Sequence, residues 1–256
     1  KKDSVVTDSI TYKIFYPRFR IEHVFKLQQQ LANFFDNNVD SVRYKTYFNY
    51  TTRNAQAFQF KDSWNILTNE FSLITFPDKN NQSQFLKAGI GVQNIKGTLD
   101  TFNTVSLNNI LVAGEYRNRT KNQVWDVEAK GEFYLNGFNS GDYSAYISMK
   151  RLLGKKIGFL NLGFHNVNRS PSYIFNSLST FPIANRVGYN KENIIRVFGV
   201  YENPSKNLTI TGEYNVVSNY LYFDSFFTAK QEATLFNVLQ FGVSKKIKLA
   251  KHFNWY

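Results

Sequence analysis

The stretch WDVEAKGEFYL, residues 125–135, alternates between apolar and charged side chains along almost its whole length. Successive side chains of a β-strand point to opposite faces, so this alternation predicts a strand with one apolar and one charged face. In a soluble sandwich the apolar face would meet a core and the charged face would meet water. In an outer-membrane barrel the apolar face would meet lipid and the charged face would line the lumen. One strand is compatible with both folds, so its neighbours have to decide.

The same alternation recurs along the chain, whereas apolar residues at helical spacing are hard to find over any long window. Clear examples lie at 86–93, 110–117, 143–150 and 208–215. No run of about 18 apolar residues occurs, so the sequence does not predict a transmembrane helix. The alternating stretches predict strands at 10–16, 19–30, 63–77, 83–94, 107–118, 123–136, 142–153, 156–167, 193–203, 207–217, 233–248 and 252–256.

The connections between these strands alternate between short and long. Short turns are predicted at 78–81, 119–122, 154–155, 203–206 and near 250–251. A medium loop at 137–141 and longer loops at 31–62, 95–106, 168–192 and 218–232 are predicted between them. Outer-membrane barrels have short periplasmic turns and longer extracellular loops. Sandwiches with Greek-key crossings have no reason to keep this order over so many hairpins. The connections therefore favour the membrane barrel.

The composition agrees with a membrane barrel. Aromatic residues make up 17% of the chain, with 25 Phe and 16 Tyr, as in barrels with aromatic girdles. The formal net charge is +12, and several lysines lie near the short turns, where lipid phosphates or periplasmic solvent would meet them. This local explanation leaves no need for a nucleic-acid partner. Cysteine is absent, which excludes disulfides and thiolate metal sites.

In the predicted strands, charged residues of both signs occupy the positions that alternate with the apolar residues. Mixed charges across a lumen set a transverse field and tune ion selectivity. In the alternative interpretation they pair with one another and fill the space. The residues predicted to line the lumen are Lys87, Glu115, Arg117, Asp126, Glu128, Lys130, Glu132, Lys150 and Glu213.

The sequence offers little material for catalysis or metal binding. The chain has three histidines, and no two of them have metal-ligand spacing. His165 has the lumen parity, and Ser148 and Asp126 on nearby strands could form a triad with it. The simpler interpretation is a histidine of the lumen wall. We therefore expect no enzyme activity, no catalytic residue, no metal site and no cofactor. His23 lies on an otherwise apolar face, as expected for an interfacial or partner-facing side chain.

Residues 1–256 are expected to form a single all-β domain, an antiparallel transmembrane β-barrel with at least 11–12 strands. The last predicted strand, 252–256, has five residues. A membrane-spanning strand needs roughly 9–11 residues. We therefore expect the chain to be an incomplete part of a larger barrel.

Four stretches, in this order, resemble the putative porin family, which comprises outer-membrane β-barrels of Gram-negative bacteria. They are YPRFRIEHVF (16–25), NRSPSYIFN (168–176), SNYLYFD (218–224) and VSKKIKLAKHFNW (243–255). The tryptophan-bearing stretch that the family usually has after the long loop is poorly matched at 179–191. The resemblance implies a single barrel that lets solutes diffuse, and it implies no catalytic residues.

The sequence thus predicts a bacterial outer-membrane channel for passive diffusion of small hydrophilic solutes. Its expected partners are outer-membrane lipid, the solutes and other outer-membrane proteins. One alternative is a non-conducting barrel that serves as a subunit of a larger outer-membrane assembly. A second is a soluble β-sandwich that binds glycans through its aromatic residues.

Overall fold

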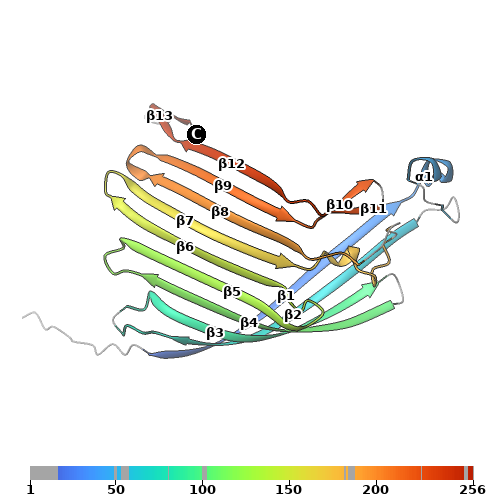
Figure 1. Ribbon diagram of the computed structural model, residues 1–256, viewed down its shortest axis with the longest axis horizontal. Helices are drawn as coiled ribbons and strands as arrows, with labels where there is room; N and C mark the ends of the chain where they lie inside the picture. Colours follow the sequence, from blue (N-terminus) through green and yellow to red (C-terminus); the bar gives the residue numbers. More distant parts are fainter. Residues whose placement is uncertain are drawn as a thin grey trace, which may run out of the picture.

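The computed structural model describes residues 17–48, 51–52, 58–79, 81–99, 103–181, 183, 188–225, 227–250 and 253–255. Its main element is one antiparallel sheet of ten strands, which follow one another in chain order. Figure 1 shows these strands running side by side. They are β1 (Phe19–Asp36), β2 (Phe58–Thr75), β3 (Gln84–Leu99), β4 (Asn103–Arg119), β5 (Trp125–Gly137), β6 (Tyr143–Gly154), β7 (Gly158–Arg169), β8 (Glu192–Asn203), β9 (Leu208–Ser218) and β12 (Phe236–Lys245).

Smaller elements lie beyond the strand ends. The α1 helix and the β10–β11 hairpin are at one end of the sheet, and β13 is at the other (Figure 1). No helix in the described ranges has the length and apolarity to cross a membrane. The bounds are α1 (Ser41–Phe48), β10 (Tyr220–Ser225), β11 (Thr228–Glu232), β13 (Ile247–Ala250), β14 (Phe253–Trp255) and the 3-10 turns Tyr173–Phe175 and Pro204–Lys206.

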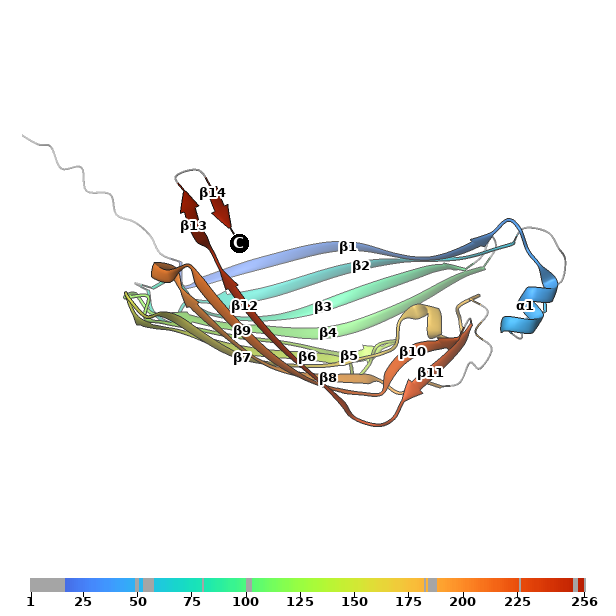
Figure 2. The same ribbon diagram turned by 90° about the horizontal axis from the view of Figure 1, so that it is seen from above.

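The all-β antiparallel fold is confirmed, and the sheet is open among the described strands. The strand order runs from β1 to β12, and these two strands are its edges. Figure 2 shows the sheet from above as a curved layer with β1 on one side and β8 on the other. A single curved sheet has no second sheet to pack on, which excludes the β-sandwich alternative.

Several predicted boundaries need correction. The predicted strand at 10–16 lies outside the described residues. The predicted loop 95–106 is mostly strand, because β3 continues to Leu99 and β4 begins at Asn103. The predicted loop 31–62 contains the end of β1, the helix α1 and the start of β2. The predicted loop 218–232 holds the β10–β11 hairpin, and the final predicted strand forms the short β14, which pairs with β13.

The pairing register gives each strand the same two faces throughout the sheet. Trp125 and Ala145 lie on the apolar face, and Asp126 and Ser148 lie on the other. The same assignment continues through β7, β8, β9 and β12. The predicted facing is therefore confirmed for these strands: all apolar-parity residues share one face. A slip of one residue in any pair would exchange the two sets.

The first four strands are longer than the rest, and the polarity of the two faces inverts along β2, β3 and β4. β1 to β4 have 16 to 18 residues, whereas β5 has 13 and the later strands of the sheet have fewer. Near the short turns of β2, Phe71 and Leu73 are exposed on the apolar face. Toward the other end the same face carries Ser63 and Asn65, and Trp64 is buried on the opposite face.

Strands β3 and β4 invert at the same level. In β3 the exposed Ile90 and Val92 give way to Lys96 and Thr98, while Ile95 becomes buried on the other face. In β4 the exposed face likewise changes from Ile110 to residues 104–108 with Thr, Ser and Asn. The ends of these strands therefore form a wall with a water-facing outside and an apolar inside.

The apolar inside of this wall forms the main buried cluster. Trp64, Ile66, Ile95 and Leu99 pack together under Tyr173 of the long β7–β8 loop. The rings of Trp64 and Tyr173 stack at 4.6 Å between centroids. Stacked aromatic pairs add about 0.5–1.5 kcal/mol beyond their burial. The long loop is thus folded against the sheet.

We predict that Gly97→Ala disturbs this cluster. A Cβ at position 97 would lie 2.6 Å from the Trp64 ring, so the indole must move. Overpacking of this kind typically costs about 1–3 kcal/mol of unfolding free energy. The matched control is Gly212→Ala, because a Cβ there has no neighbour within 4 Å. Urea unfolding in detergent, followed by tryptophan fluorescence, should separate the two variants, and equal stabilities would contradict the packing.

Candidate functional site

The predicted lumen-lining residues all lie on one face of the sheet. The register aligns Lys87 with Glu115, Glu115 with Lys130 and Asp126 with Lys150 across neighbouring strands. Five of the nine predicted residues line a single hollow of about 600 Å³, together with Lys26, Glu70 and His165. Because strands β1 to β7 all contribute to one hollow, the charged face is the concave one. We call this face the charged wall.

At the β1–β3 side of the wall, Lys87 lies at the centre of an ion-pair cluster. Its Nζ is 2.5 Å from Glu22 Oε1 and 3.5 Å from Glu70 Oε1. Lys26 reaches the second carboxylate oxygen of Glu70 at 4.0 Å, and Arg20 reaches Glu22 at 3.8 Å. The cluster links three neighbouring strands along the wall, rather than crossing the hollow.

The next cluster is on β4 and β5. Lys130 Nζ lies 3.7 Å from Glu115 Oε1 and also pairs with Glu128 on its own strand. Its ammonium is half exposed, with a side-chain exposure of 50%. Exposed pairs of this kind contribute at most about 1 kcal/mol. Lys130 therefore remains in contact with the water of the hollow.

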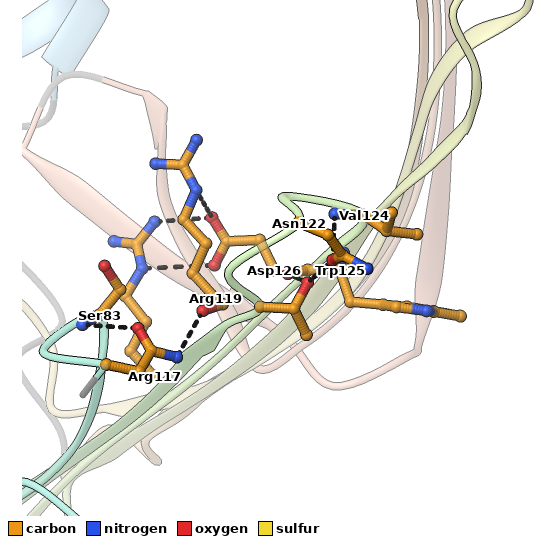
Figure 3. A network of polar contacts seen from close by, with 9 residues as sticks. Ser83, Arg117, Arg119, Asn122, Val124, Trp125 and Asp126 are labelled. Atoms are coloured by element: carbon orange, nitrogen blue, oxygen red, sulfur yellow. Dashed lines mark hydrogen bonds and ion pairs between the residues drawn. The ribbon is translucent and has the colours of Figure 1, made fainter. Parts of the chain in front are cut away.

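Asp126 forms the third cluster, close to a short turn (Figure 3). Arg117 donates two hydrogen bonds to it, at 3.3 and 3.1 Å, in the planar geometry that suits a carboxylate. Arg119 approaches the same carboxylate at 3.9 Å. Figure 3 shows Trp125 pointing away from this cluster, and the guanidinium of Arg151 lies 4.6 Å from its ring on the apolar face.

Two further pairs follow on β6 to β9. Lys150 donates to Glu202 at 2.8 Å, and Arg196 donates to Glu213 at 2.5 Å. Glu202 was not among the predicted residues, although it has the same parity as Lys150. Around the hollow and these ion pairs, the wall carries equal numbers of basic and acidic side chains. They are Arg20, Lys26, Lys87, Arg117, Arg119, Lys130, Lys150 and Arg196, with Glu22, Glu70, Glu115, Asp126, Glu128, Glu132, Glu202 and Glu213.

His165 lies on the charged wall, among the residues that line the hollow. Ser148 lies opposite Gly163, and Asp126 is bound by its arginines, so the triad considered as an alternative does not form. Instead the Ser144 hydroxyl lies 3.0 Å from His165 Nε2. The hydrogen bonds of the described residues join no carboxylate to this histidine. The described residues also contain no group of three His, Cys, Asp or Glu that could hold a metal ion.

The charged hollow continues into two smaller ones toward the long loop. A neighbouring hollow of about 280 Å³ shares Glu132 and Ser144 with it, and we call this second hollow the neck. The neck in turn shares Gln30, Asn139 and other residues with an outer hollow of about 460 Å³. A path therefore runs along the concave face, from the charged wall through the neck to the loop end.

The long loop, residues 170–191, covers the apolar end of the concave face and is held there by Asp62 of β2. Asp62 is fully buried, and its carboxylate accepts hydrogen bonds from the Ser179 hydroxyl and from the Thr180 hydroxyl at 2.6 Å. The Thr180 backbone N–H also donates to it, at 3.2 Å. Leaving such a buried acceptor without donors costs about 1–3 kcal/mol or more. Asp62 therefore holds the middle of the loop against the sheet, and we call its contacts with Ser179 and Thr180 the latch.

Two more carboxylates hold the base of the loop. Asp142 accepts hydrogen bonds from the Ser170 backbone N–H at 2.9 Å and from Lys191 Nζ at 2.5 Å. Glu192 pairs with Arg169 at 2.9 Å. Both ends of the loop are thus tied to the rim, and the latch holds its middle.

The β10–β11 hairpin completes the cover of the concave face. We call the hairpin and loop 170–191 together the cap. Phe227 of the hairpin packs edge-on against Phe34 of β1 at 5.6 Å and Phe60 of β2 at 6.0 Å between centroids. It also contacts Phe181 of the loop at 5.8 Å. The hairpin therefore spans from the β9 side of the sheet to the β1 side.

The sequence reasoning missed the three carboxylates that hold the cap. Asp62 falls inside the predicted loop 31–62, where no strand parity is assigned. A usable signal existed, because Asp62, Trp64 and Ile66 continue the parity of Thr68 and Glu70 in the same strand. The inverted polarity of that stretch marks where the sheet needs a cover of its own.

The comparisons with known proteins add a family to this geometry. Comparison with curated proteins and with solved structures found no match. A protein-family model described as "Putative porin" matches residues 9–256. This match spans almost the whole chain, including every strand of the sheet. The chain therefore belongs to the putative porin family.

Proposed function

We propose that this chain forms a bacterial outer-membrane channel through which small hydrophilic solutes diffuse passively, without a reaction or a cofactor. The observation that carries the proposal is the two-sided sheet. One face exposes large apolar side chains such as Ile90, Ile147 and Leu162, and the other borders a charged hollow. Apolar surface of this extent is unfavourable in water and favourable in lipid.

Membrane insertion also sets a requirement for the sheet edges. Backbone N–H and C=O groups in lipid need hydrogen-bond partners, so β1 and β12 must be paired there. We expect the bilayer to surround the part of the sheet near the short turns that exposes apolar residues, with the inverted ends of β2 to β4 standing outside it. The cap then lies on the extracellular side, and Lys155 and the other short turns lie in the periplasm.

The balanced wall predicts a weakly selective pore that single charge reversals can bias. Lys130→Glu and Lys150→Glu each remove a cation and add an anion to the hollow, so both should shift selectivity toward cations. Reversal potentials of the full-length protein, measured in planar bilayers under a KCl gradient, report this directly. Lys96→Glu is the matched control, because Lys96 is exposed on the outside of the inverted wall. An identical reversal potential in all four proteins would contradict a lumen at the charged wall.

The latch predicts how the cap limits conductance. Asp62→Ala removes the acceptor for Ser179 and Thr180, so the loop should detach more often and conductance should rise. Deletion of residues 168–192 should raise the conductance further. Asp224→Ala is the control, since its pair with Lys230 is exposed on the hairpin. Folded variants that stay silent in bilayers, loop deletion included, would favour the non-conducting subunit of an outer-membrane assembly.

The proposed sidedness can be tested in whole cells, because the chain lacks cysteine. Cysteines placed singly at Ser177 in the cap and at Lys155 in a short turn both occupy exposed positions. A membrane-impermeant maleimide should label position 177 on intact cells, and it should label position 155 only after the outer membrane is opened. Equal labelling of both positions on intact cells would refute the orientation.

A further inference from the structure

The neck differs in chemistry from the charged wall beside it. Its lining is rich in carboxamide and hydroxyl groups: Gln28 and Gln30 come from β1, and Asn139, Asn168 and Tyr173 come from the β5–β8 side. Burial raises the pKa of Tyr173 to about 12, so this phenol stays neutral. The neck therefore presents mainly uncharged hydrogen-bonding groups to a solute.

The charged groups at the neck are largely neutralised by partners outside it. Arg169 is bound to Glu192, and Asp142 is bound to Lys191. Glu132 stands at the border with the charged hollow and lines both spaces. An anion that entered the neck would lose water without gaining a free positive charge there, which is unfavourable.

Gln28 and Gln30 are the groups of the neck that are available to a ligand. Both are exposed, and neither side chain has a hydrogen bond within the described part of the chain. Each carboxamide offers two donors and one acceptor oxygen, which suits neighbouring hydroxyl groups. Asn139, by contrast, is occupied by Asn109 and Asp142. Beyond the neck, Tyr220 lines the outer hollow with an aromatic ring that is 43% exposed.

We propose that the neck is a binding site for neutral polyhydroxylated solutes, namely sugars and short oligosaccharides. Gln28 and Gln30 hydrogen-bond the hydroxyl groups, and Tyr220 packs on the apolar face of a sugar ring at the outer entrance. This inference rests on the proposed diffusion function, for which it names the class of solute. Binding at the neck favours neutral sugars over charged ones of the same length.

The test uses the full-length protein with maltotriose as the neutral probe and a galacturonic acid trimer as the charged one. Maltotriose should block the ion current reversibly in bilayers and should bind the detergent-solubilised protein in equilibrium dialysis. Gln28→Ala combined with Gln30→Ala should weaken both effects about tenfold, the loss expected for one or two hydrogen bonds. Gln29→Ala is the matched control, because Gln29 lies between them on the opposite face, where it donates to Ser63.

The two readouts separate the inference from the function on which it rests. Dialysis that detects maltotriose binding, lost in the double variant, supports the site even in a barrel that conducts no ions. A conducting channel that maltotriose neither blocks nor binds overturns the site and leaves the diffusion function standing. Equal or tighter binding of the charged trimer, or equal losses in the Gln29→Ala control, also overturns the site.

Discussion

The fixed register of the sheet is the constraint on which the other features depend. Every pairing from β1 to β12 keeps the same parity on the same face, so one exposed apolar surface and one charged surface form without further devices. The pairing of β4 with β5 is irregular beside Leu111, where the register shifts and Tyr134 keeps its place on the concave face. The β6–β7 pairing shifts once more at its turn end, between Leu152 and Gly154. A slip elsewhere would move charges such as Asp126 to the apolar face, at a cost of several kcal/mol for each group buried without a partner.

The inverted ends of β2 to β4 explain why the protein has a cap. Where the outside of the wall becomes polar, its inside becomes apolar, and Trp64 and Ile95 have to be covered. The cover is attached mainly by carboxylates that accept several hydrogen bonds each. Hydrogen bonds require a narrower range of distances and angles than hydrophobic contacts do. Trp64 Nε1 has no hydrogen-bond partner among the described residues, so the closed arrangement keeps one unsatisfied donor. That cost, about 1–3 kcal/mol, makes the cap easier to open than its contacts alone would indicate.

The sequence predicted the fold well wherever alternation was regular. Strands β5 to β9 were placed within one or two residues, because Asp126, Lys150 and their neighbours follow an unbroken two-residue period. It failed at 95–106, because Gly97 and the polar residues around it are typical of loops. In the structure that glycine makes room for an indole ring. The charged side of the candidate site followed from parity alone. The cap and the neck could not be predicted from parity, because their contacts join residues such as Asp62 and Ser179 that no local pattern connects.

The contact between Asp62 and Ser179 joins residues 117 positions apart in the chain. Contacts between such distant residues form late, because the intervening chain must first lose its conformational freedom. The intervening segment contains β3 to β7, so the latch closes only after those hairpins have assembled. The wall is thus assembled first, and the cap closes over it in a final step of folding. For the proposed channel, an intermediate in which the latch has not formed would have a wider entrance than the mature protein.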